Sequence, residues 1–91
     1  MDPMNLTVVY KNGAFKITIS KSKTLLDLKK EIANHFGGNT SYTGFNVLTN
    51  NKIIHTNDDN SKTLEELGIA RMIRLPNNYI PGMQDFFKLI K

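Results

Sequence analysis

Apolar and polar residues alternate over the first twenty positions in a pattern typical of a β-hairpin. Residues 6–10 are rich in β-forming side chains, and Phe15, Ile17 and Ile19 alternate with polar neighbours. The pair at 12–13, Asn-Gly, is favoured in type I′ turns because both central residues need a positive φ there. The pattern predicts an antiparallel hairpin with one buried face. A one-residue slip would turn that face into water, so we expect a firm register.

Residues 24–36 change to the spacing of an amphipathic helix. Thr24 is the expected N-cap, and Asp27 completes a capping-box variant that also places an acid in the first turn. The Gly-Gly pair at 37–38 supplies the stop. The apolar positions follow at spacings of three, four and four residues and form one stripe over about three turns: Leu25, Leu28, Ile32 and Phe36.

Shorter elements follow in the second half of the chain. The pattern predicts strands at 45–49, 52–55 and 72–75. Between the last two, residues 63–68 predict a single helical or 3-10 turn, because Thr63 and Glu66 form a second capping pair and a glycine ends it.

The order of these elements predicts an α+β fold of the ββαββ type. The sheet is mixed, with one main helix and a short helical turn. A helix that follows a hairpin must cover one face of the sheet. The first and last strands can then pair in parallel at the centre, because a long crossover joins them.

Three segments, in this order, resemble the ubiquitin family. Residues 22–32 (SKTLLDLKKEI) are similar to that family's helix entry, with a threonine cap and a lysine-rich outer face. Residues 51–54 (NKII) resemble its glycine-lysine-x-leucine turn and short strand, and residues 63–69 (TLEELGI) resemble its threonine-leucine turn. The resemblance covers residues 4–75 and implies a ubiquitin-like β-grasp domain.

The carboxyl end departs from the family's conjugated modifiers, which end in Gly-Gly. Here Leu75 is followed by PNNYIPG, and the one Gly-Gly pair stands at the predicted helix end. We therefore interpret residues 4–75 as a non-conjugated ubiquitin-like domain of a larger protein. Residues 76–91 would be a C-terminal tail or linker with a possible short helix, and residues 1–3 a cloning remnant before a natural start at Met4.

The resemblance also implies a partner-binding surface on the side of the sheet away from the helix. An apolar residue of the third strand anchors that surface in the family. Leu48 falls at this position, with Lys52 beside it. On the last strand we assign Met72 and Arg74 outward, and Val9 joins them from the first strand.

The resemblance implies protein docking as the function, and two other classes of function remain open. Non-conjugated ubiquitin-like domains dock to ubiquitin receptors, proteasome subunits or a segregase. The alternatives are an assembly module of a splicing, transcription or other complex, and a lysine-rich RNA-binding domain. A formal charge of +4 permits the last, with lysines gathered around one helix start: Lys21, Lys23, Lys29 and Lys30. Arginine, which phosphate and base contacts favour, occurs only twice, so the pattern favours a solvated surface over a nucleic-acid site. We expect a monomeric protein-binding domain.

No pattern predicts catalysis, a metal or a cofactor. His35 and His55 are far apart and lack a nucleophile with an orienting group. The acidic pair at 58–59 has no further ligand spacing, and the chain has no cysteine. No apolar run approaches the roughly 18 residues of a membrane span, so we expect a cytoplasmic or nuclear protein.

The tail carries a second helical stripe, formed by Met83, Phe86, Phe87 and Ile90. Three interpretations stay open. The tail could pack on its own domain, act as a linker or a fragment of a next domain, or dock a partner as a short helix.

Overall fold

The predicted hairpin forms two strands of eight residues each, β1 (Pro3–Tyr10) and β2 (Gly13–Ser20). They pair antiparallel along their whole length, from Pro3 with Ser20 to Tyr10 with Gly13. The computed structural model describes residues 3–36, 44–49 and 52–77. Strand β1 thus starts one residue before the domain boundary that the sequence indicates.

The hairpin turn lies one residue earlier than the sequence predicts. Gly13 pairs with Tyr10, so Lys11 and Asn12 are the two loop residues. A type I′ turn would need a positive φ at both, yet the described non-glycine residues with positive φ are Lys52 and Arg71. Gly13 has an extended φ of 158° and belongs to the strand. The prediction of a type I′ turn at 12–13 was therefore wrong, although the hairpin itself is confirmed.

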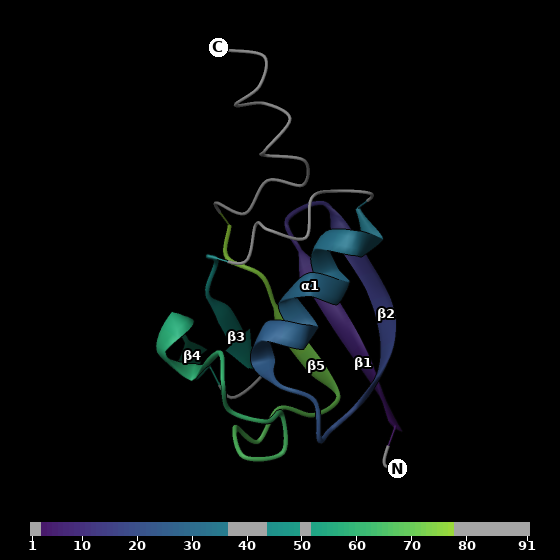
Figure 1. Cartoon of the computed structure of the whole chain (residues 1–91). Coiled ribbons are helices and arrows are strands. Elements are labelled where there is room, and N and C mark those ends of the chain that lie inside the picture. Colours follow the sequence, from purple (N-terminus) through teal and green to yellow (C-terminus); the bar gives the residue numbers. More distant parts are fainter. Residues whose placement is uncertain (1–2, 37–43, 50–51, 78–91) are drawn as a thin grey trace.

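Helix α1 (Leu25–His35) lies across one face of the sheet (Figure 1). Its N-terminus carries the predicted capping box. The Asp27 amide donates to Thr24 Oγ1 at 3.2 Å, and the Thr24 amide donates to Asp27 Oδ2 at 3.2 Å. Three stripe residues are completely buried and Phe36 is half-buried against them. The predicted glycine stop at 37–38 lies outside the described residues.

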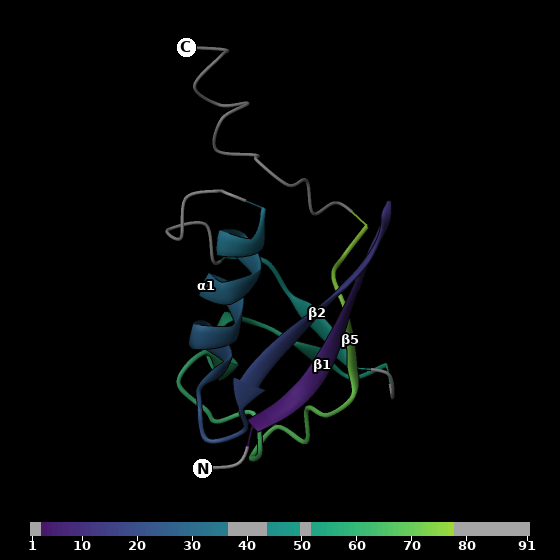
Figure 2. The same ribbon diagram turned by 90° about the vertical axis from the view of Figure 1, so that its right-hand side faces the viewer.

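The remaining elements are short. They are β3 (Val47–Thr49), β4 (Ile54–His55), the 3-10 helix η1 (Asn57–Asp59) and β5 (Met72–Arg74). The sheet order is β2-β1-β5-β3-β4. Strand β5 lies at the centre, parallel to β1 and antiparallel to β3. The views of Figures 1 and 2 show α1 on one side of this sheet and no element of the described chain on the other.

A 3-10 helix, η1, lies in the polar stretch between β4 and the turn predicted at 63–68. Residues 64–68 form the predicted single turn, in which the Leu67 amide donates to the Thr63 carbonyl four residues earlier at 3.1 Å and the Gly68 amide to the Glu65 carbonyl at 3.1 Å. Its capping pair is confirmed, because the Glu66 amide donates to Thr63 Oγ1 at 3.1 Å and the Thr63 amide to Glu66 Oε1 at 2.9 Å.

The core lies between α1 and the sheet, and it settles the register of β5. Ile73 and Leu75 are buried, whereas Met72 is half-buried and Arg74 exposed. The predicted outward assignment of Met72 and Arg74 is therefore confirmed. In the described chain, no helix is long and apolar enough to cross a membrane.

The two capping boxes predict how stability depends on pH. The backbone amide of Thr24 lowers the pKa of Asp27, and that of Thr63 lowers the pKa of Glu66. At low pH the unfolded chain therefore binds more protons than the folded one. We expect the stabilisation to be full above the ordinary carboxyl pKa of about 4 and to be lost as pH falls through the lower folded values.

Thermal unfolding followed by circular dichroism between about pH 6 and pH 2 tests this expectation. The variant with Asp27→Asn and Glu66→Gln keeps side chains that can accept a capping hydrogen bond but cannot titrate. Its melting temperature should fall less over the same pH range than that of the wild type. An identical acid loss in wild type and variant would contradict the assignment.

Candidate functional site

The strand register aligns side chains in a row across the face of the sheet opposite α1, which we call the open face. Arg74 of β5 pairs with Val9 of β1 on one side and with Leu48 of β3 on the other. Leu48 pairs in turn with Ile54 of β4. Residues paired in register project to the same side of a sheet, so these four residues form one row across four strands.

A second row runs beside the first. Met72 of β5 pairs with Thr7 of β1, and Thr7 pairs with Lys16 of β2. Met72 stands two residues before Arg74 on the same strand, so both project from the open face. The thioether of Met72 thus lies diagonally across from Leu48, within reach of a long side chain.

Between these rows the surface sinks into a hollow of about 370 Å³, which we call the open-face hollow. That volume falls within the range of roughly 300–1,000 Å³ that ligand pockets occupy. Four of the five predicted site residues line it. Val9 does not, because Arg74 stands between it and the hollow. The described lining residues are Leu48, Thr49, Lys52, Met72 and Arg74.

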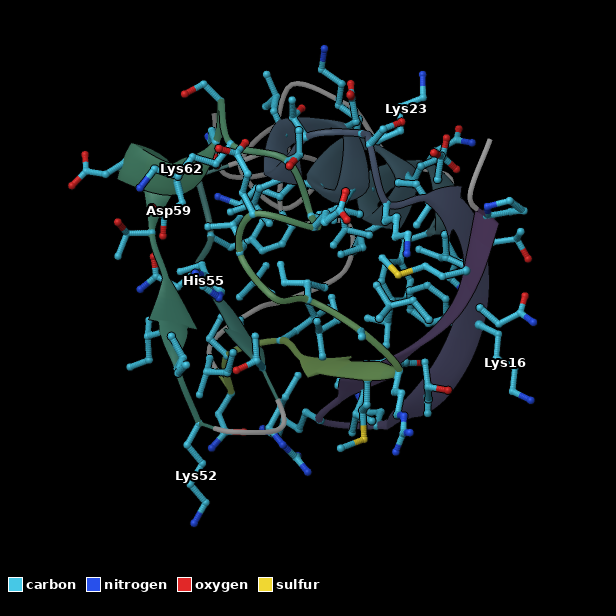
Figure 3. The ribbon with its side chains drawn as sticks, turned by 90° about the horizontal axis from the view of Figure 1, so that it is seen from below. Lys16, Lys23, Lys52, His55, Asp59 and Lys62 are labelled. Carbon is cyan, nitrogen blue, oxygen red and sulfur yellow. The ribbon has the colours of Figure 1, made fainter. Side chains whose placement is uncertain are left out.

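A tight turn after β3 places Lys52 at the rim of the hollow. The Lys52 amide donates to the Thr49 carbonyl at 2.9 Å, and the Ile53 amide donates to Thr49 Oγ1 at 3.2 Å. Lys52 itself has a φ of 66°, a conformation that costs a non-glycine residue about 1 kcal/mol or more. Figure 3 shows its side chain pointing away from the body of the protein, on the side opposite α1. The buried Thr49 thus holds a strained turn that presents a cation.

Solved structures with the same arrangement identify the fold. The ubiquitin-like domain of an Arabidopsis thaliana protein superposes with a TM-score of 0.68 at 21% identity, covering 88% of this chain and 82% of that one. The UBL domain of Plasmodium falciparum Dsk2 gives 0.60 at 24% identity, covering 80% and 95%. Ubiquitin of Caldiarchaeum subterraneum gives 0.62 at 13% identity, covering 88% and 99%. The fold is the ubiquitin-like β-grasp fold. No protein-family model matches the sequence, and no curated protein matches it significantly.

Sequence reasoning missed one residue of the open face. Ile54 is 56% exposed, although it is a large apolar residue, and it pairs with Leu48. The adjacent isoleucines at 53 and 54 indicated that one of them lies on the open face, because neighbouring side chains of a strand point to opposite faces. The sequence could not show which isoleucine joins the open face, since β4 is only two residues long and begins at Ile54.

Charges are divided unevenly over the surface of this β-grasp fold. The open face carries Lys16, Lys52 and Arg74. The described carboxylates lie on α1 and in the segment between β4 and β5 instead: Asp27, Glu31, Asp58, Asp59, Glu65 and Glu66. The open-face hollow is therefore an apolar site with a cationic rim.

Lys29 corrects the predicted lysine-rich outer face of the helix, because its side chain is completely buried. Helical periodicity places it one turn from Leu25 and from Ile32, at the edge of the buried stripe. Its Nζ donates to the side-chain oxygens of Asn57 at 3.0 Å and Asn60 at 2.8 Å. Burial lowers the pKa of this amine, against the opposing effect of Asp59. Lys29 therefore secures η1 to the helix and is not available for nucleic acid.

The two histidines have separate structural neighbours. The His35 ring stacks on Phe15, with centroids 3.6 Å apart and planes 4° apart. His55 is buried on β4, and its Nδ1 lies 3.1 Å from Asp59 Oδ2. Asp59 also contacts Lys62 at 3.4 Å, and Figure 3 shows these three side chains at the β4 end of the sheet. The hydrogen bond to His55 lowers the pKa of Asp59. In the part of the chain that the structure describes, no group of three or more His, Asp or Glu residues could hold a metal ion.

Proposed function

We propose that this chain is a non-catalytic protein-docking domain and that a partner protein binds in the open-face hollow. The observation that carries the proposal is the pairing of Leu48 with Arg74 and with Ile54, which sets an apolar side chain at the centre of a hollowed, cation-rimmed face. Apolar anchors that fill pockets near the centre of an interface supply most of the binding energy in protein complexes.

The charge pattern of the open face supports a partner segment that is apolar at its centre and acidic at its ends. An apolar segment flanked by carboxylates would place its apolar side chains against Leu48 and Met72. Its acidic groups would meet Lys52 and Arg74. Complementary charges of this kind steer association and fix the orientation of the partner.

The partner class belongs to the same proposal. We propose a ubiquitin receptor, a proteasome subunit or a segregase as the partner, and the cytoplasm or nucleus as the setting. The likeness of fold to ubiquitin-like domains supports the protein-docking part of this proposal. An assembly role in another complex would use the same face and differs only in the partner. The buried Lys29 is not available to the RNA-binding alternative, and carboxylates accompany the remaining lysines, since Asp27 and Glu31 line one hollow together with Lys23 and Lys30.

Leu48→Ala is expected to weaken partner binding by roughly 1–2 kcal/mol, about 5- to 30-fold, while leaving the fold intact. The measurement is capture of purified proteasomes, ubiquitin receptors and segregase on the immobilised full chain, followed by titration of whatever binds. The matched control is Leu26→Ala, which truncates a half-buried leucine on α1.

Equal binding by wild type and Leu48→Ala would contradict the proposed site. Lys52→Gly adds a test of the cationic rim, since glycine adopts the positive φ of that position without strain. It should slow association at low salt and leave stability unchanged or slightly raised.

A further inference from the structure

We propose that the apolar stripe of residues 83–90 covers the open-face hollow of its own chain and competes there with the protein partner, a regulation that rests on the proposed docking function. The stripe lies outside the described residues, and the inference joins its sequence pattern to the place where the described chain leaves the sheet.

The stripe has the chemistry that the hollow accepts. In a helix, the spacing of Met83, Phe87 and Ile90 would place them within one narrow sector, with Phe86 beside them. Phenylalanine buries about 150–250 Å² when it packs. The hollow offers Leu48 and Met72 as apolar walls.

The connection to the stripe starts at the hollow itself. Arg74 lines the hollow and is the last residue of β5, and the Leu75 amide still donates to the Val9 carbonyl at 2.8 Å. Figure 2 shows the described chain leaving the sheet at this end of β5. The nine residue steps from Arg74 to Met83 reach up to about 30 Å when extended. The Pro-Gly pair at 81–82 would allow a reversal, and a helix over 83–90 would be about 12 Å long.

Tethering makes a weak contact sufficient. A short flexible linker holds its ligand at an effective concentration in the millimolar range. A stripe that binds a separate hollow with a dissociation constant of about 0.1 mM would then occupy its own hollow about ten times in eleven. The apparent affinity for a partner would fall about tenfold, because only the uncovered fraction can bind.

A spin label tests the contact directly in the full chain. The sequence has no cysteine, so Asp85→Cys offers one labelling position, on the opposite side of the helix from Met83. We expect strong paramagnetic broadening of the Leu48, Met72 and Arg74 amide signals, whereas those on the outer side of α1 keep their intensity. Adding Phe86→Ser and Phe87→Ser should abolish the broadening. The matched control, Gln84→Ser with Lys88→Ser, should preserve it.

A peptide supplies the second measurement. A synthetic peptide of residues 78–91, added to the full chain with Phe86→Ser and Phe87→Ser, should shift the Leu48 and Met72 methyl signals. The same peptide should shift them much less when Leu48→Ser is also present. Absence of both the broadening and the peptide shifts would overturn the proposal. So would broadening that appears only between a spin-labelled copy and a separate isotope-labelled copy, since a second chain would then occupy the hollow.

The outcome separates this proposal from the docking function. If the stripe does not contact the hollow but Leu48→Ala still loses its partner, the cis contact fails and the docking function stands. If the stripe covers the hollow but adding Leu48→Ala to the variant with Phe86→Ser and Phe87→Ser leaves partner binding unchanged, the competition and the docking function both fail. Both hold if Phe86→Ser with Phe87→Ser raises partner affinity severalfold and Leu48→Ala, added to that variant, lowers it.

Discussion

Lys29→Ala is expected to lower the free energy of unfolding by about 3 kcal/mol, the scale of a large-to-small change in a core. The completely buried side chain contributes its four-carbon stem to packing, and its Nζ lies 5.5 Å from the Phe45 ring centroid. Truncation would also leave the side-chain oxygens of Asn57 and Asn60 without this donor.

Lys29→Met separates the two contributions. Methionine keeps most of the apolar volume but cannot donate a hydrogen bond, so we expect a smaller loss, about 1–2 kcal/mol. Urea denaturation of both variants gives the free energies, and amide exchange should show the largest loss of protection around η1. If Lys29→Ala lay within about 0.5 kcal/mol of wild type, the lysine would be solvent-exposed, as the sequence pattern alone indicates.

Ile54→Ser is the second change with a large expected effect, on binding rather than on stability. Ile54 extends the apolar row beyond Leu48, and a partner that fills the open-face hollow would desolvate both. We expect partner affinity to fall about tenfold or more, and unfolding to change little because the side chain is already 56% exposed.

Ile53→Ser is the matched control for this change. Ile53 is 52% exposed, almost as much as Ile54, but it precedes β4 and pairs with no residue of the row. Isothermal titration of the two variants against the same partner should therefore give unequal losses. Equal losses would show that general surface hydrophobicity, and not the row, determines binding.

The sequence carried most of the fold because its signals are local. A capping box at Thr24 and a stripe of three- and four-residue spacings specify α1 without any distant contact. The hairpin follows in the same way from alternation in β2. The position of the hairpin turn was mispredicted because a glycine at 13 suits both the centre of a turn and the end of a strand. The pairing of Gly13 with Tyr10 places it in the strand.

The candidate site depended on non-local pairing, which the sequence expresses less completely. Leu48, Met72 and Arg74 could be assigned outward by alternation once Ile73 was taken as core. The pairing of Ile54 with Leu48 could not be predicted, because a strand of two residues is too short to show an alternation of apolar and polar side chains. Lys29 was wrongly predicted to be exposed for a related reason. Its charge suggested solvent, whereas the amide oxygens that satisfy it lie 28 and 31 residues further along the chain.

The most direct test of the docking surface is an NMR titration of the isotope-labelled full chain with the purified partner that it captures. If a partner docks on the open face, the largest chemical-shift changes are expected on the four strands that carry the row, at Val9, Leu48, Ile54, Met72 and Arg74. Largest shifts on the outer side of α1, at Lys23, Lys30 and Glu31, with an unchanged open face, would contradict it.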